Sequence, residues 1–346
     1  MTTSQLPSII HLRNPTPTAP NNAKPKQTYI IYFITGNPGL IEYYRTFHTH
    51  LYALLSTSNQ NVDFQIYGRS LSGFEVDNSS TDNTNKNRVA PPYSLQDQIQ
   101  NSGKALEDLI NSLVNQGIKA PQVILIGHSV GSYILLELIR SFREGLIKAP
   151  EKNVKIVGGI CLFPTVTHIA KSASGRRAGW LICQKHTAAA ASVLARLLLL
   201  LIPTNVLSSL ISVFMSFPQD AARTTATFAK SKHGILQALH MARDEMHEIT
   251  SDTWDEEVWG AAHPSPSQHP RPVLRFLFAK SDHWVADETR DELMKVRARV
   301  DGVEEWKPKM EIDEKEGWPH AFCIRHSIPV AGRVKEYIDD IIESSS

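Results

Sequence analysis

Short apolar runs alternate along the chain with segments whose apolar residues recur every three or four positions. The first kind is typical of buried strands and the second of amphipathic helices. Five apolar runs are predicted to form strands: residues 28–34, 62–67, 123–126, 154–163 and 273–279. Helices are predicted from residue 94 and over residues 130–142, 287–300 and 331–342. Because apolar strands and helices alternate, the pattern predicts an α/β fold with a mostly parallel sheet covered on both faces.

The segment of residues 164–272 interrupts this alternation. It has no convincing strand pattern and holds the most hydrophobic stretch of the chain. We therefore predict a core formed by residues 28–163 and 273–346, and a helical cap formed by residues 164–272. The cap is expected above the carboxyl ends of the strands, where open α/β sheets bind their ligands. Residues 1–27, polar and rich in proline, predict a flexible arm, and the Asn-rich residues 75–92 predict a surface insertion.

The cap contains two apolar halves separated by Pro203-Thr204-Asn205. Residues 188–202 carry a single charge, Arg196, and residues 206–217 carry none. A membrane-spanning helix needs about 20 apolar residues, and a proline prevents one straight helix through both halves. Two hypotheses follow. The halves form a hairpin that inserts into one leaflet of a lipid surface, or they form the core of the cap.

Composition and charge narrow the class of protein. Hydrophobic residues make up 42% of the chain and charged residues 21%, which is typical of a folded protein. The net charge of +1 gives no electrostatic footprint for nucleic acid. The cysteines at positions 161, 183 and 323 contain no CxxC pattern, so neither a disulfide framework nor a zinc cluster is expected. The first residues lack the features of a signal peptide, which predicts a cytosol-facing protein that is not secreted.

A G-x-S-x-G motif, Gly127-His128-Ser129-Val130-Gly131, lies between a predicted strand and a predicted helix. In this context the serine sits on a strained turn, and the glycines let neighbouring backbone approach without a Cβ clash. The turn places Oγ at a helix N-terminus, where developing negative charge is favoured. Ser129 is therefore the candidate nucleophile; the alternative is a glycine-rich turn with an incidental serine.

A second turn, Gly36-Asn37-Pro38-Gly39, follows the first predicted strand. A nucleophilic serine needs two backbone N–H donors aimed at the oxyanion of the tetrahedral intermediate. One is expected from Val130, which follows the nucleophile. The other is expected from Asn37, since Pro38 has no N–H. The alternative is an ordinary Asn-Pro-Gly turn.

The acid and the histidine of such a site follow the serine in that order. Asp282 lies just past the strand of residues 273–279 and is the candidate acid, with Asp287 as the alternative. Of the later histidines, His283 adjoins the acid and is expected to point away from it. His320 lies between a strand-like segment, residues 309–312, and the last helix, and is preferred as the base over His326. The competing interpretation is a solvated carboxylate and a surface imidazole.

These segments together resemble one known family. The resemblance rests on TGNPGLIEYYRTF, LIGHSVGSYILLEL, FLFAKSDHW and PHAF, and extends from about residue 28 to 343. The chain is similar here to the lipid droplet-associated hydrolases, a eukaryotic family with the α/β-hydrolase fold. The chain departs from the animal pattern at residues 75–92 and 251–268, and neither departure touches the motif positions.

The resemblance implies a function and a location. Ser129, Asp282 and His320 would be nucleophile, acid and base, in ester hydrolysis of neutral lipids such as sterol esters and triacylglycerol. The protein would lie at the surface of lipid droplets and the endoplasmic reticulum, and would need no metal or organic cofactor. Serine at the nucleophile position argues against epoxide hydrolase chemistry, which uses aspartate there. A second hypothesis is a lipid droplet surface protein that binds or organises lipid, with a weak or vestigial hydrolase site.

Overall fold

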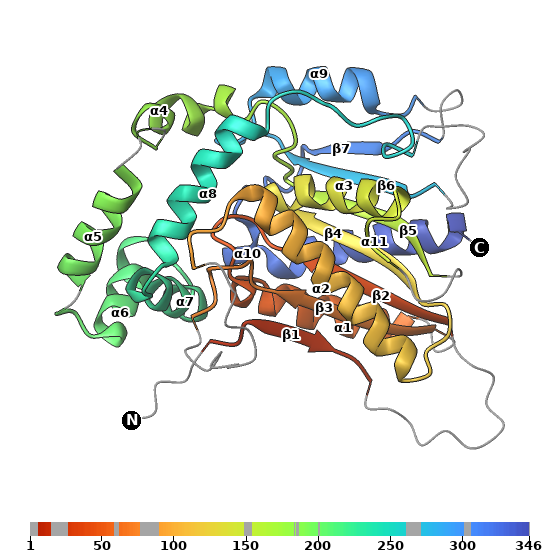
Figure 1. Cartoon of the computed structure of the whole chain (residues 1–346), viewed down its shortest axis with the longest axis horizontal. Helices are drawn as coiled ribbons and strands as arrows, with labels where there is room; N and C mark the ends of the chain where they lie inside the picture. The colour runs from red at the N-terminus through yellow and green to blue at the C-terminus, as the bar shows by residue number, and fades with distance from the viewer. Residues whose placement is uncertain are drawn as a thin grey trace.

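The computed structural model describes residues 6–14, 27–58, 62–76, 90–148, 154–182, 184, 187–199, 201–260, 271–300 and 306–345. At its centre lies a seven-stranded sheet of order β1-β3-β2-β4-β5-β6-β7 (Figure 1). Only β1 is antiparallel to its neighbour; every other pair is parallel. The strands are β1 (Ile9–Leu12), β2 (Gln27–Ile34), β3 (Val62–Arg69), β4 (Gln122–His128), β5 (Lys155–Leu162), β6 (Val273–Ala279) and β7 (Lys309–Asp313). The predicted parallel sheet is confirmed.

Two hydrophobic cores lie on the two faces of this sheet, because successive side chains of a strand point to opposite faces. In β2, Ile30, Tyr32 and Ile34 belong to one core, while Ile31 and Phe33 belong to the other. The first core is completed by α2 (Leu95–Asn115), α3 (Val130–Arg143) and α9 (Asp287–Arg297). The second is completed by α1 (Arg45–Ser58) and α11 (Ser327–Ser345), which lie behind the sheet in Figure 1.

The cap lies beyond one end of the sheet, at the left of Figure 1. Between β5 and β6 the described residues form no strand but the 3-10 turn η2 (Ile169–Lys171) and five helices. These are α4 (Ala173–Ile182), α5 (Thr187–Leu199), α6 (Thr204–Phe214), α7 (Gln219–Lys230) and α8 (Gly234–Glu248). The described part of residues 164–272 therefore contains helices and no strand.

Helix α8 is one of the parts of the cap that are hydrogen-bonded to the core. The Gln237 side chain accepts the N–H of Tyr93 at 2.7 Å and donates to the Tyr93 carbonyl at 2.8 Å. The Asp244 carboxylate accepts the N–H of Leu95 at the start of α2. At the other end of the cap, Arg325 donates to the carbonyls of Met215 and Ser216, just past α6. Arg325 ends α10 (Phe322–Arg325), a short helix of the core.

Helices α5 and α6 expose most of their apolar side chains. Leu198 on α5 is 66% exposed and Phe214 on α6 is 82% exposed, and Leu201 in the turn between them is 89% exposed. Among the described residues, only Ser192 on α5 and Leu207 and Ser208 on α6 are buried. No single helix among the described residues is long and apolar enough to span a membrane; α5 and α6 would suffice only as a pair, and they are bent by 107°. The two helices therefore do not form a core of the cap.

The arm predicted for residues 1–27 needs a correction. Residues 9–12 form β1 at the edge of the sheet, and the side chain of Ile10 is 4% exposed in the second core. A four-residue strand is too short to stand out from the polar residues around it. Residues 15–26, and residues 77–89 of the predicted insertion, lie outside the described residues.

The last helix begins at Ser327 rather than at residue 331, because Pro329 falls in its first turn, where a missing N–H costs little.

The first turn of α3 packs directly on the end of β2. A Cβ added at Gly131 would lie 2.4 Å from the carbonyl oxygen of Ile34 and 2.7 Å from that of Thr35. Any side chain here therefore forces two elements of the core apart. A Cβ added at Gly127 would lie 2.3 Å from the carbonyl oxygen of Gly131, so a side chain at position 127 would also clash with the backbone of α3.

We predict that Gly131→Ala lowers the free energy of unfolding by about 1–3 kcal/mol, as overpacking of a core does. Gly332→Ala is the matched control, because Gly332 also lies in a helix but has open space around the added Cβ. It is expected to raise the free energy of unfolding by up to about 1 kcal/mol. Urea denaturation of both variants measures the difference. Equal effects would contradict the close approach.

Candidate active site

Ser129 occupies a sharp turn between β4, which ends at His128, and α3, which begins at Val130. Its φ of 55° and ψ of −125° lie in a region that residues with a side chain rarely adopt. The turn is held by the Ser129 N–H, which donates to the carbonyl of Leu162 on β5 at 3.0 Å. The strained turn expected from the motif is therefore present, and it aims Oγ away from the sheet.

Two further side chains form a continuous chain with Ser129. Nε2 of His320 lies 2.9 Å from Ser129 Oγ, and Nδ1 of His320 lies 2.7 Å from Oδ2 of Asp282. An ionised carboxylate only accepts, so Nδ1 carries the proton and donates to Asp282. Nε2 is then free to accept the hydroxyl hydrogen of Ser129. The arrangement can take a proton from the serine and hold the resulting imidazolium against a negative charge.

The hydrogen-bond partners of the Asp282 carboxyl keep it ionised. Its side chain is 3% exposed, and burial by itself raises its pKa. The hydrogen bond and charge of His320, with the Trp284 N–H that donates to Oδ1 at 2.8 Å, outweigh burial and hold the pKa of Asp282 below its usual value. The carboxylate is therefore the charged partner of His320 at neutral pH.

Two backbone amides lie beside Ser129. The N–H groups of Val130 and Asn37 find no hydrogen-bond acceptor among the described residues. The loop that carries Asn37 lies against the serine, because a Cβ added at Gly36 would lie 3.0 Å from the Cβ of Ser129. Both amides are therefore free to donate to an oxygen held near Oγ. The Asn37 side chain does not take part, since it is bonded to α8.

The alternative candidates lie elsewhere. Asp287 is exposed in the first turn of α9 and forms an ion pair with Arg290 at 3.0 Å. His283 is exposed, and its backbone carbonyl accepts the N–H of Ser174. His326 follows α10, with a buried Nδ1 that has no hydrogen-bond partner within the described part of the chain. None of the three is hydrogen-bonded to Ser129 in the described part of the chain. Within the described ranges, no group of three His, Cys, Asp or Glu side chains is placed to hold a metal ion.

Comparison with known proteins places this site in a family. The family model described as lipid-droplet associated hydrolase matches residues 27–323. The chain belongs to the lipid droplet-associated hydrolase family. A lipid droplet-associated hydrolase of Mus musculus is 25% identical over 325 residues, covering 92% of this chain and 86% of the relative. One of Dictyostelium discoideum is 25% identical over 334 residues, covering 95% of this chain and 91% of the relative.

Solved structures establish the fold of this family member. A peroxisomal α/β-hydrolase of Saccharomyces cerevisiae aligns with a TM-score of 0.56 at 11% identity, covering 98% of this chain and 89% of that one. A juvenile hormone epoxide hydrolase of Bombyx mori aligns with a TM-score of 0.52 at 14% identity, covering 98% and 74%. The predicted α/β-hydrolase fold is therefore confirmed.

In this lipid droplet-associated hydrolase family member, His128 and Tyr44 support the site, and the sequence analysis did not identify them. His128 Nε2 lies 2.9 Å from the carbonyl oxygen of His320, which only accepts, so Nε2 carries the proton. Nδ1 then accepts the hydroxyl hydrogen of Tyr44 at 2.7 Å, and the Tyr44 oxygen accepts the N–H of Gly36 at 3.1 Å. Burial lowers the pKa of His128 to about 3, so the ring stays neutral. Position two of G-x-S-x-G and the second tyrosine of the YY pair were the available signals.

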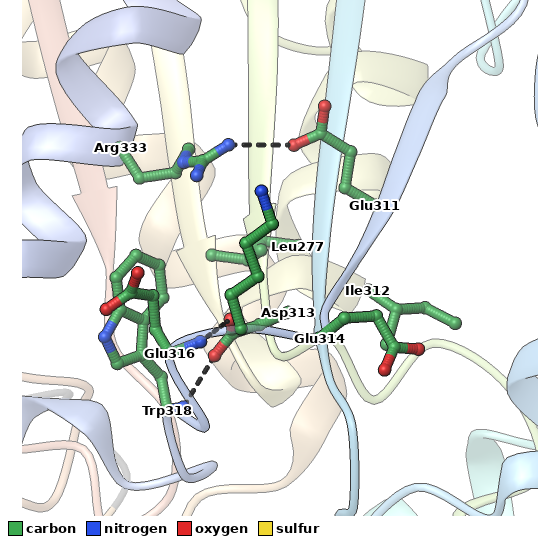
Figure 2. A pocket seen from close by; sticks show the side chains of 9 residues that line it. Leu277, Glu311, Ile312, Asp313, Glu314, Glu316, Trp318 and Arg333 are labelled. Atoms are coloured by element: carbon green, nitrogen blue, oxygen red, sulfur yellow. Dashed lines mark hydrogen bonds and ion pairs between the residues drawn. The ribbon is translucent and has the colours of Figure 1, made fainter.

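Asp313 at the end of β7 holds the loop that leads to His320. Its Oδ1 accepts the N–H of Glu316 at 2.9 Å and its Oδ2 accepts the N–H of Trp318 at 2.6 Å. Figure 2 shows both bonds in a cleft that Glu311 and Arg333 also line. The Trp318 side chain is 6% exposed and packs in the second core. The position of His320 therefore depends on a carboxylate seven residues before it.

We predict that Asp313→Ala lowers the free energy of unfolding by about 1–3 kcal/mol, the cost of leaving a buried N–H unpaired. Glu314→Ala is the control, because the ion-pair partner of Glu314 among the described residues is Lys280, and both side chains are more than half exposed. Exposed pairs contribute about 0–1 kcal/mol. Chemical denaturation measures both variants. The assignment is wrong if Asp313→Ala is no more destabilising than Glu314→Ala.

Proposed function

We propose that the protein is a serine ester hydrolase that acts on neutral lipid esters, such as sterol esters and triacylglycerol, at lipid droplets. The observation that carries the proposal is the chain from Ser129 Oγ through His320 to Asp282, with distances of 2.9 and 2.7 Å. Membership of the lipid droplet-associated hydrolase family supports the substrate class.

The geometry supports the following reaction. Ser129 Oγ attacks the acyl carbonyl carbon while His320 Nε2 takes the hydroxyl proton, and Asp282 stabilises the imidazolium. The oxyanion of the tetrahedral intermediate accepts the N–H groups of Asn37 and Val130. His320 then gives its proton to the departing alcohol, which leaves an acyl-enzyme. Water attacks this ester with His320 again as base, and collapse of the second intermediate returns the proton to Ser129 and releases the acid.

The exposed apolar side chains of α5 and α6 support a location on a lipid monolayer. Monolayers over neutral lipid have no second aqueous side, so a bent pair of short helices suits them better than a spanning helix does. Exposed apolar surface of this extent is unusual for a soluble protein and is typical of an interaction site. We infer that α5 and α6 insert into the monolayer of droplets, and into the cytosolic leaflet of the endoplasmic reticulum membrane.

The same exposed surface also favours a second function, a droplet surface protein that binds or organises lipid. Lipid binding through α5 and α6 does not require the serine. A fluorophosphonate reagent separates the two functions, because it reacts with a serine only when the base and the oxyanion donors are in place. Labelling of Ser129 favours the hydrolase, and a folded protein that stays unlabelled favours the binding function.

We predict that Ser129→Ala and His320→Ala each lower ester hydrolysis about 10⁴- to 10⁶-fold, as loss of a triad member does. His326→Ala, which changes a histidine outside the chain of hydrogen bonds, retains most of the activity. Rates on p-nitrophenyl esters, triolein and cholesteryl oleate measure both the loss and the substrate preference. Retention of a tenth of the activity in Ser129→Ala would overturn the assignment, and equal loss in His326→Ala would mean that the base is misassigned.

We predict that replacing Leu198, Leu201 and Phe214 together with Asp releases the protein from droplets and preserves hydrolysis of a water-soluble short ester. The control replaces three exposed apolar residues elsewhere, Leu146, Val296 and Ile328, and leaves droplet binding unchanged. Flotation on artificial droplets measures binding, and circular dichroism checks the fold. A triple variant that unfolds or still floats contradicts the inference.

A further inference from the structure

Glu245 is a buried carboxyl in the cap that contacts the candidate oxyanion loop. It lies on α8 and is 4% exposed. Its Oε1 accepts a hydrogen from Asn37 Nδ2 at 2.9 Å, and the other Nδ2 hydrogen goes to the carbonyl of Ala238, also on α8, at 3.0 Å. Both hydrogens of the Asn37 carboxamide are therefore used by one helix.

The surroundings of Glu245 favour its neutral form. Burial raises its pKa, the hydrogen bond from Asn37 lowers it less, and the charge of Asp244 raises it further, to about 8. The Asp244 carboxylate lies 3.6 Å from Nε2 of His240, one turn before it on the same helix. The other charged or titratable side chains on α8 and on the described parts of elements packed against it are Asp97, Lys104, Glu107, Asp108, Lys171, Arg176, Arg177, Arg196, Asp220, Arg223, Lys230, Arg243, His247 and Glu248. None of these is a hydrogen-bond partner of Glu245 within the described residues.

The Asn37 carboxamide has an oxygen that lacks a hydrogen-bond donor. Its Oδ1 is buried and has no hydrogen-bond partner among the described residues. An unpaired buried acceptor is unfavourable, so a neighbouring group that can donate a hydrogen bond to it is stabilised. A neutral carboxyl has one O–H to donate besides the oxygen that accepts, whereas a carboxylate has none. A protonated Glu245 can therefore meet both ends of the carboxamide.

We propose that Glu245 is a positioning residue that, in its protonated form, pairs with the Asn37 carboxamide and so fixes the Asn37 backbone N–H for the oxyanion. The role in the reaction rests on the proposed hydrolase function. Helix α8 provides a rigid support, because Gln237 and Asp244 bond it to the core. The cap thus contributes to the reacting centre through one hydrogen-bonded pair, at a point outside the apolar helices.

Three variants test the pair. Glu245→Gln keeps one acceptor and one donor and cannot ionise, so it should retain kcat at pH 7 within about twofold. Glu245→Ala removes both and should lower kcat about 10- to 100-fold, up to the effect of losing one oxyanion donor, while KM changes little. Glu245→Ala should also weaken, by a similar factor, the binding of a trifluoromethyl ketone inhibitor, which forms an oxyanion when Ser129 adds to it. Glu248→Gln neutralises a carboxyl one turn away that bonds only Gln96 within the described residues, and should match the wild type.

The pH dependence of kcat distinguishes the positioning role from a merely structural one, because a structural role would leave it unchanged. As pH rises through about 8, wild-type Glu245 ionises and loses its donor, so kcat falls; Glu245→Gln lacks this fall. The folded-state pKa is raised above the unfolded value, so the wild type binds the proton more tightly when folded and loses stability as pH rises from about 4.5 to 8. The melting temperature of Glu245→Gln relative to the wild type should therefore rise over that range.

The outcomes are distinguishable. Parallel melting temperatures of Glu245→Gln and the wild type from pH 5 to 9 would overturn the protonated pair, whether or not the protein is a hydrolase. Should Glu245→Ala not fold, Glu245→Gln decides: its pH profile of kcat must lose the alkaline fall, and a profile that matches the wild type overturns the positioning role. Wild-type protein that hydrolyses no ester would instead refute the proposed function and leave the stability measurement to judge the pair.

Discussion

The site depends on one close approach between backbones, that of the first turn of α3 on the end of β2. Only the absence of a Cβ at Gly131 allows the carbonyl of Ile34 to lie where it does. Because the loop after β2 starts at this contact, it also determines where Gly36 and Asn37 lie relative to Ser129. The strained backbone of Ser129, with a φ of 55°, is maintained by this packing together with the hydrogen bond from its N–H to the carbonyl of Leu162.

Directional hydrogen bonds then connect segments that are far apart in the chain. From the N–H of Gly36 through Tyr44 and His128 to the carbonyl of His320, every donor and acceptor is determined, because one end is an amide and the other a carbonyl. A charged His128 would have to donate from both nitrogens and would break the series. Burial prevents that charge on His128. The loop that carries Gly36 and the loop that carries His320 therefore keep fixed positions relative to each other.

The sequence predicted what depends on local pattern. Apolar runs and helical periodicity identified five of the seven strands, a sixth was noted as strand-like at residues 309–312, and the motif with chain order named three side chains that the structure brings together. It missed β1, whose four residues carry too little apolar pattern. It also missed the partners of the site, because Tyr44, Glu245 and Asp313 act through contacts with segments that only the fold brings near. Nothing in the local sequence of a cap helix indicates that its carboxyl will lie on Asn37.

The bond from Arg325 to the end of α6 has a consequence for orientation. Helices α5 and α6 join the body at α4 on one side, and on the other Arg325 holds the carbonyls of Met215 and Ser216. A segment attached at both ends can tilt, but it cannot swing freely like a tail. Any surface that α5 and α6 contact therefore meets the whole molecule at a restricted angle. Arg325 lies only five residues after His320 in the chain. A change in the protein's tilt on that surface is therefore expected to act on the loop that carries His320.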